Sequence, residues 1–280
     1  MRNWCSRHPV WFMAFYALFY LTFFALLERT IQSPDLWVHC RLDDLIPFCK
    51  YAIVPYLLWF PWIPFTLFYL LYKAPRGDFW RLCLPLFTGM TMALLFYAIV
   101  PNGLALRPRF VPGSDIFARL VRAIYRSDTP MNVCPSIHVF NSVTLMLAYY
   151  RSSIFDAPRR RWMRPAAMVL CVSITMSTML LKQHSVIDVV FGLLLALTLA
   201  QRCKACPQDA DACRSGCKTK HPLPVFAVQA GGVLLFMVKR GLLLFRYSAY
   251  TKMPATIMTS AAIFLGFIFS WKIVTPKIVT

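Results

Sequence analysis

Long apolar runs, separated by short charged segments, constrain this chain more than any other feature of its sequence. They fall at roughly 9–27, 51–72, 82–101, 133–150, 165–181, 185–200, 223–238 and 253–271. A helix needs about 20 residues to cross the ~30 Å hydrocarbon core of a bilayer. Only 15% of the residues are charged and 59% are hydrophobic, whereas about a quarter of the residues of a soluble domain are charged. We therefore expect an integral membrane protein with little chain left for a separate water-soluble domain.

The apolar runs are continuous rather than alternating, which favours helices over a membrane-spanning barrel. The predicted fold is all-α: a polytopic integral membrane helical bundle with a six-helix core plus about two extra C-terminal spans. Residues 1–200 would form the core, 201–222 a cytoplasmic Cys-rich basic loop and 223–280 the additional pair of transmembrane segments. The first run could pass for a signal sequence, but it lacks a small-x-small cleavage site, so a retained anchor is predicted.

The basic residues that give the chain its formal net charge of +19 lie between the apolar runs. There they set orientation and meet anionic headgroups, so we do not expect nucleic-acid binding. The short loop 151–164 contains five arginines and one acid, which predicts a cytoplasmic amino terminus. Loops 102–130 and 239–252 are also basic and argue the other way. We expect the plasma membrane as the location.

Ionisable side chains beside the spans form two clusters, and such side chains are usually functional because an unpaired charge in a membrane is costly. With a cytoplasmic amino terminus, both clusters share the extracytoplasmic face with an arginine. The residues are Arg107-Pro108, Pro135-Ser136-Ile137-His138, and Ser177 with Lys182, His184 and Asp188. Cations and a serine hydroxyl can hold phosphate oxygens while one imidazole attacks phosphorus and another protonates the leaving oxygen. The clusters therefore indicate phosphoryl transfer.

These motifs, in this order and spacing, resemble the three signature motifs of the type 2 phosphatidic acid phosphatase superfamily over roughly residues 42–200. Residues 43–48 and 182–188 also resemble the branch that contains inositol phosphorylceramide synthases and related bacterial membrane proteins. The resemblance implies a six-span catalytic domain in which His184 attacks phosphorus to form a phosphohistidine. It also implies that Asp188 hydrogen-bonds the other ring nitrogen of His184 and that His138 protonates the leaving lipid oxygen and then deprotonates the acceptor.

Five side chains would hold the phosphoryl oxygens: Arg107, Ser136, Lys182, Ser177 and Arg109. The chain departs from the family at three positions, where Val100 replaces a lysine, Thr178 an arginine and Ile137 a glycine. Two phosphate-binding cations are thus missing from their usual places. Lys182 and Arg109 are the natural substitutes, since each lies two residues from a motif residue.

The sequence therefore predicts an integral membrane lipid-phosphate phosphatase that works through a phosphohistidine, without a metal or other cofactor, because no carboxylates cluster near the histidines to bind magnesium. Its partner would be a membrane lipid substrate, either a lipid phosphate or a pyrophosphate. One alternative is a headgroup phosphotransferase similar to inositol phosphorylceramide synthase, in which a lipid alcohol resolves the intermediate. Another is a catalytically inactive protein that binds lipid phosphate, which the residues Val100 and Thr178 keep open.

Less specific roles compete for several of these residues. His184 and His138 could be interface histidines without chemistry, Asp188 could cap the sixth helix, and Arg109 could be a snorkelling loop cation. The adjacent acids Asp43-Asp44 look like a carboxylate pair, but acids in loops are usually solvated, which favours a structural role.

Four of the ten cysteines lie in the loop 201–222, at Cys203, Cys206, Cys213 and Cys217. Four thiolates could form a tetrahedral zinc site, but the irregular spacing of the second pair favours free thiols. Cys40 and Cys49 lie together on the predicted outer side and could pair.

Overall fold

A computed structural model of the chain describes residue 4 and residues 7–202, and most of these residues are helical. The helices are α2 (Pro9–Thr30), α3 (Arg41–Leu45), α4 (Ile53–Lys73), α5 (Arg76–Ile99), α6 (Ile116–Ser127), α7 (Ile137–Arg151), α8 (Met163–Leu180) and α9 (Val186–Arg202). Short 3-10 helices cover Lys50–Ala52 and Ser153–Phe155. Strands β1 (Leu36–Trp37) and β2 (Asn102–Gly103) form a small parallel pair.

Four helical segments are long and apolar enough to cross a membrane: Pro9–Thr30, Lys50–Lys73, Arg76–Ile99 and Met163–Leu180. The shorter helices α7 and α9 occupy the fourth and sixth predicted runs, and α9 contains a further apolar segment at Val186–Ala200. These helices confirm the all-α class and fit a membrane bundle, whereas helix length does not establish the predicted count of six core spans plus two. The predicted runs 223–238 and 253–271, the loop 201–222 and its four cysteines lie outside the described residues.

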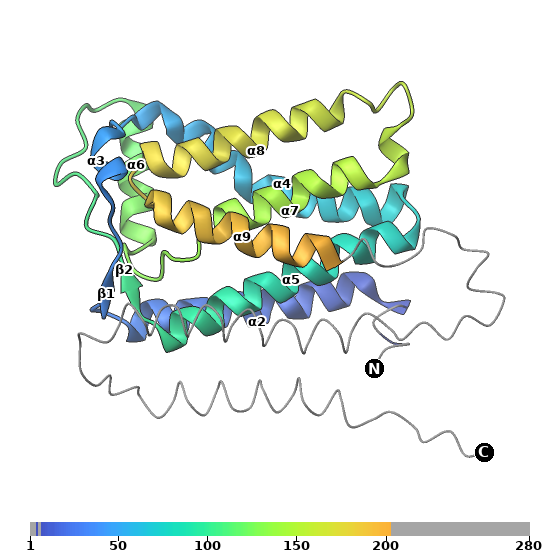
Figure 1. Ribbon diagram of the computed structural model, residues 1–280, viewed down its shortest axis with the longest axis horizontal. Coiled ribbons are helices and arrows are strands. Elements are labelled where there is room, and N and C mark those ends of the chain that lie inside the picture. The colour runs from blue at the N-terminus through green and yellow to red at the C-terminus, as the bar shows by residue number, and fades with distance from the viewer. Residues whose placement is uncertain (1–3, 5–6, 203–280) are drawn as a thin grey trace, which may run out of the picture.

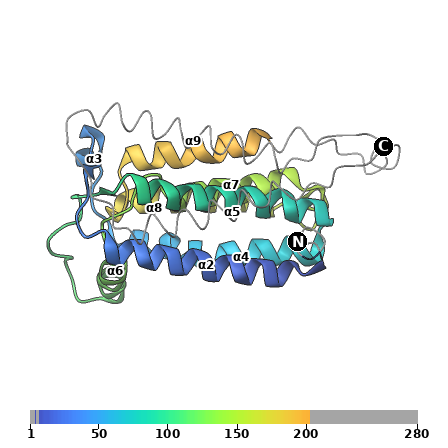
Figure 2. The same ribbon diagram turned by 90° about the horizontal axis from the view of Figure 1, so that it is seen from below.

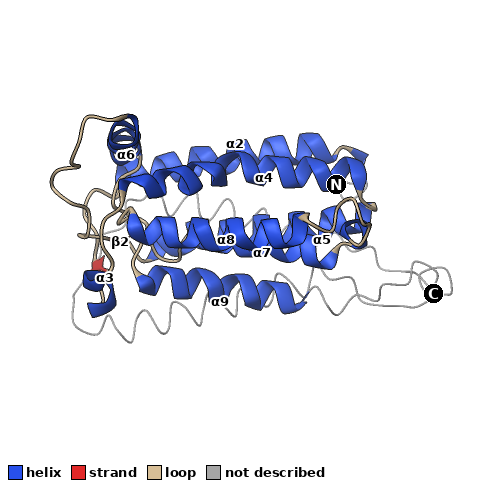
Figure 3. Ribbon diagram, turned by 90° about the horizontal axis from the view of Figure 1, so that it is seen from above, coloured by secondary structure: helices blue, strands red, loops and turns tan. Residues whose placement is uncertain are grey.

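The long helices run side by side, and α7 packs against α5, α8 and α9 (Figure 1). Helix α4 packs against α5 and α8, and α2 packs against α5. Figures 2 and 3 show α9 on one side of α5 and α7, with α2 and α4 on the other. Close approach of α9 to α7 requires Gly192, because a Cβ atom there would lie 2.6 Å from the carbonyl oxygen of Ser136.

One end of the bundle carries α3, α6 and the two strands (Figure 1). Helix α6 lies crosswise to the long helices (Figures 2 and 3), and its first turn is capped by Asp115, which accepts from the backbone N–H groups of Phe117 and Ala118 at 3.1 Å. Its buried residues Ala118 and Val121 belong to the same apolar cluster as residues of α4. The basic loop predicted at 102–130 therefore contains an amphipathic helix across the end where α5 and α8 stop and α7 and α9 start.

Candidate active site

The two motif histidines meet at this end of the bundle. Helix α7 begins at Ile137 because Ser136 caps it, with its hydroxyl oxygen 3.4 Å from the backbone nitrogen of Val139. His138 therefore lies in the first turn of α7, whereas His184 lies in the hinge between α8 and α9. Nδ1 of His138 is 3.2 Å from Nε2 of His184, and both residues are 7% exposed.

Asp188 holds the other side of the His184 ring. Its Oδ2 atom lies 3.3 Å from Nδ1 of His184 and also accepts from the backbone N–H of Ser185 at 2.8 Å. The backbone carbonyl of Asp188 accepts from the N–H of Ser136 at 3.1 Å, which joins the beginning of α7 to α9. Because the carboxylate accepts from Nδ1–H, the lone pair of His184 is on Nε2 and points towards His138.

Aromatic packing fixes the ring of His138. The ring lies 4.8 Å from that of Tyr56 and 4.3 Å from that of Trp59, measured between centroids, and both residues belong to α4. Within the described part of the chain, Nε2 of His138 and the indole nitrogen of Trp59 are buried without hydrogen-bond partners. The packing thus orients the imidazole and leaves buried polar atoms beside the two histidines that a ligand can satisfy.

Arg107 reaches the hinge from the loop after α5. Its guanidinium donates to the carbonyl oxygens of Asp128 at 2.7 Å and Thr129 at 3.2 Å, and to the side chain of Gln183, the residue before His184. Burial lowers the pKa of Arg107, with the Asp128 carboxylate acting in the opposite direction. Its Nε atom has no partner among the residues that the structure describes. Arg107 is therefore a half-buried cation that contacts the residue before His184 and has one buried donor left over.

The other predicted phosphate ligands differ in their surroundings. Ser136 is fully buried at the start of α7, while Ser177 donates to the carbonyl of Ile174 in its own helix at 2.7 Å. The Lys182 ammonium group donates to the backbone carbonyls of Asp43, at 2.7 Å, and of Ile46. Arg109 is exposed. The structure thus places Arg107 in contact with the residue before His184 and Ser136 two residues before His138, and contacts of all five side chains with phosphate stay predictions.

Two of the three positions where the chain departs from the family, Val100 and Thr178, are buried. Val100 ends α5 and is 5% exposed, and Thr178 is fully buried in α8. The carbonyl oxygen of Thr178 accepts from the backbone N–H groups of Gln183, at 2.9 Å, and His184, at 3.2 Å. At the position where the family has arginine, the backbone carbonyl of this chain therefore stabilises the hinge that carries His184.

Two supporting residues were not predicted from the sequence. Asn102 is fully buried, and its side-chain oxygen accepts from the backbone N–H groups of Val133 and Cys134 at 2.9 and 2.8 Å. Tyr97 donates to the carbonyl of Pro135 at 2.6 Å. Both hold the segment just before His138. The available signal was an amide at the end of an apolar run, where a buried polar side chain needs partners.

The two adjacent acids differ in their exposure and in their hydrogen-bond partners. Asp43 is 1% exposed and accepts three hydrogen bonds, so the expectation that it is solvated is wrong. Asp44 is exposed and its carboxylate lies 3.0 Å from Nε2 of His39. Cys40 and Cys49 are free thiols rather than a disulfide. In the part of the chain that the structure describes, no group of three or more His, Cys, Asp and Glu residues could hold a metal ion.

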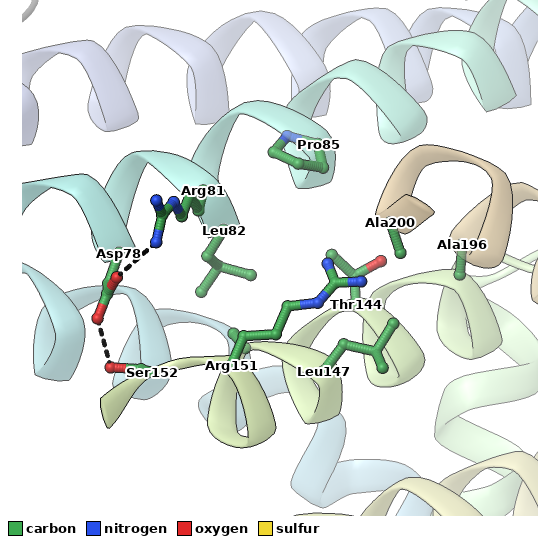
Figure 4. A pocket seen from close by; sticks show the side chains of 11 residues that line it. Asp78, Arg81, Leu82, Pro85, Thr144, Leu147, Arg151, Ser152, Ala196 and Ala200 are labelled. Carbon is green, nitrogen blue, oxygen red and sulfur yellow. Dashed lines mark hydrogen bonds and ion pairs between the residues drawn. The ribbon is translucent and has the colours of Figure 1, made fainter. Parts of the chain in front are cut away.

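A cavity between α5, α7 and α9 lies towards the opposite ends of these helices from the histidines. Figure 4 shows Asp78 linking Arg81 and Ser152 at its rim. Its lining residues are Asp78, Arg81, Leu82, Pro85, Thr144, Leu147, Ala148, Arg151, Ser152, Ala196 and Ala200. None of them belongs to the three motifs, so this cavity is separate from the candidate active site.

The comparison with known protein families agrees with the geometry. Residues 83–212 match the PAP2 superfamily, and this region contains Arg107, His138, His184 and Asp188. No curated protein and no solved structure matches the chain. Members of the PAP2 superfamily are generally phosphatases or phosphotransferases. With both histidines and the arginine inside the matched region, residues 83–212 of this chain belong to the phosphatidic acid phosphatase type 2 (PAP2) superfamily.

Proposed function

We propose that the chain is an integral membrane phosphatase that hydrolyses a lipid phosphate ester through a phosphohistidine at His184, without a metal. The observation that carries this proposal is the pair of contacts on the His184 ring. Nδ1 faces the carboxylate of Asp188 at 3.3 Å, and Nε2 faces His138 at 3.2 Å. An imidazole held in this way presents an unprotonated nitrogen as the nucleophile. The carboxylate stabilises the imidazolium cation that forms when this nitrogen attacks.

The proposed reaction has two steps. In the first, Nε2 of His184 attacks phosphorus, the bond from phosphorus to the lipid oxygen breaks, and His138 gives its proton to that oxygen. In the second, His138 takes a proton from water, the water oxygen attacks phosphorus, and the bond from nitrogen to phosphorus breaks to release phosphate. His184 and His138 must separate from their 3.2 Å contact for the phosphoryl group to enter between them.

Arg107 and Ser136 are the proposed phosphate ligands with the strongest structural support. Arg107 has an unused buried donor, and Ser136 lies at the amino-terminal end of α7, where the helix dipole favours an anion. Lys182, Ser177 and Arg109 complete the proposed set on sequence grounds. We expect Lys182→Met to lower the rate by about 10²-fold if its ammonium group contacts the transferred phosphoryl group.

We propose that the site faces the extracytoplasmic side of the plasma membrane, with the amino terminus in the cytoplasm. The arginine-rich loop 151–164 supports this orientation, since it joins the opposite ends of α7 and α8 from those that carry the histidines. A lipid phosphate in the outer leaflet would then reach the site along the helices.

The test uses the purified full-length chain in detergent with a panel of lipid phosphates and pyrophosphates, with and without lipid alcohol acceptors. Free phosphate and new lipid species are both measured. We expect release of phosphate, its loss in His184→Ala, and wild-type rates in the control His39→Ala, which removes an exposed histidine between β1 and α3. Transfer to an added alcohol in preference to water would assign a phosphotransferase instead. Binding of lipid phosphate without turnover would assign an inactive binding protein.

A further inference from the structure

The carboxylate of Asp43 connects α3 to the hinge that carries His184, although the two lie far apart in the sequence and Asp43 precedes the family match. Its Oδ2 atom accepts from the hydroxyl of Ser185 at 2.6 Å, and its Oδ1 atom accepts from the backbone N–H of Val186 at 2.8 Å. A third hydrogen bond comes from the backbone N–H of Cys40 at 2.8 Å. One buried carboxylate therefore caps the beginnings of both α3 and α9.

The environment of Asp43 favours its ionised form. Burial raises the pKa of this carboxyl, but the Ser185 hydroxyl and the backbone N–H groups of Val186 and Cys40 outweigh burial, so the pKa is lowered. A charged carboxylate at the first turn of α9 also interacts favourably with the helix dipole. Asp43 is thus an anion at neutral pH, and all three of its donors come from backbone or side-chain groups next to helix starts.

The same hinge is tied to α3 and the segment that follows it by three further hydrogen bonds. Lys182 donates to the carbonyl oxygens of Asp43 and Ile46, and the backbone N–H of Cys49 donates to the carbonyl of Leu180 at 3.0 Å. Lys182 has a φ angle of 52°, in the left-handed region that residues with a Cβ adopt at some energetic cost. Such a backbone persists where surrounding contacts hold it. The α3 segment therefore maintains the shape of the hinge.

Ser185 transmits this restraint to the catalytic ring. Its hydroxyl donates to Asp43, and its backbone N–H donates to the Oδ2 atom of Asp188 that also faces Nδ1 of His184. This inference rests on the function proposed above: we propose that Asp43 is a positioning residue. It acts through Ser185 to keep the Asp188 carboxylate and the His184 ring in the orientation that the reaction requires. Asp43 does not touch the transferred phosphoryl group in this proposal.

The test compares Asp43→Asn with Asp44→Asn, because the neighbouring acid is exposed and its carboxylate pairs with the exposed His39 rather than with the hinge. We expect kcat to fall by about 10- to 10²-fold in Asp43→Asn with KM little changed, the effect of moving a reacting group by a fraction of an ångström to one ångström. Asp44→Asn should match the wild type. A general loss of folded protein would lower the active fraction without changing kcat per active site, which titration with orthovanadate would reveal.

A nuclear magnetic resonance measurement separates this proposal from the function itself. In protein with isotope-labelled histidine, the Nδ1–H resonance of His184, identified by its absence from His184→Ala, should broaden or vanish in Asp43→Asn and persist in Asp44→Asn. This readout does not require turnover, so it decides the positioning role even if the chain proves not to be a phosphatase. An unchanged resonance and an unchanged kcat in Asp43→Asn would overturn the proposal.

Ser185→Ala provides a second variant in case Asp43→Asn does not fold. It removes the hydroxyl that donates to Asp43 and accepts from the backbone N–H of Ile187 at 3.2 Å, and it keeps the backbone N–H that donates to Asp188. We expect a loss of kcat in the same direction as in Asp43→Asn. The double variant should lose less than the two single losses combined, because both changes break the hydrogen bond between Ser185 and Asp43. A wild-type kcat and an intact resonance in Ser185→Ala would refute the connection.

Discussion

Gly192 sets the distance between α9 and the start of α7, so Gly192→Ala should disturb the active site from outside it. A Cβ atom at this position would lie 2.6 Å from the carbonyl oxygen of Ser136 and 3.2 Å from Cβ of Val139. Ordinary contact begins at 3.4 Å, so the Ser136 carbonyl must move away by about 0.8 Å. Overpacking of this kind costs about 1–3 kcal/mol, and the better helix propensity of alanine returns only ~0.5–1 kcal/mol.

The Ser136 carbonyl lies two residues before His138, and a misplacement of about 1 Å can lower a rate by 10²-fold. We therefore expect Gly192→Ala to lower the free energy of unfolding by about 1–2 kcal/mol and kcat by at least tenfold. The measurements are thermal unfolding in detergent and phosphate release. The matched control is Gly77→Ala in the first turn of α5, where no atom lies within 4 Å of the added Cβ. If both variants behave alike, the close approach of α9 to α7 does not position the histidines.

The remaining predictions concern sidedness, pH and inhibitors. A cysteine introduced in loop 110–125 should react with an impermeant reagent added to intact cells, and one in loop 155–163 should not; the reverse pattern would place the site in the cytoplasm. Burial raises the pKa of Asp128 from 3.8 to about 6, with Glu28 adding to the rise and Arg107 opposing it. A raised carboxyl pKa costs stability once the group ionises, so the stability of Asp128→Asn relative to wild type should increase between pH 4 and 6 and level off above. If thermal unfolding shows that the stability of Asp128→Asn relative to wild type decreases from pH 4 to pH 6, the raised pKa of Asp128 is contradicted. Orthovanadate should inhibit phosphate release because it mimics trigonal-bipyramidal phosphorus, whereas chelators should not; activity lost to a chelator and restored by magnesium would indicate another reaction class.

The sequence predicted the helices well because a helix that spans a membrane must also be a long apolar run in the sequence. The first run at 9–27 became Pro9–Thr30, and the run at 165–181 became Met163–Leu180. The boundaries differ where a helix continues through polar residues. Helix α5 begins at Arg76 rather than near residue 82, because the helical hydrogen bonds of the backbone extend through charged residues that precede the apolar run.

The supporting contacts of the site could not be predicted, because they join residues far apart in the sequence. Periodicity reports which face of a helix is apolar but not which loop carboxylate will meet which helix start. Asp43 and Asp44 are chemically identical neighbours, and only the packing of α3 against the hinge makes one buried and the other exposed. Likewise, the sequence places Lys182 two residues from His184, but its carbonyl partners in and just after α3 depend on tertiary structure.

The central claim is that His184 becomes covalently attached to phosphorus, and trapping of the intermediate tests it most directly. The purified chain would be mixed with a lipid phosphate that carries a radiolabelled phosphoryl group, quenched in denaturant within milliseconds and digested. The account predicts a label that is stable to base and labile to acid, on the peptide that contains His184. It should be present in His39→Ala and absent from His184→Ala. Label that persists in His184→Ala, or that maps to Ser136 or His138, would contradict the account.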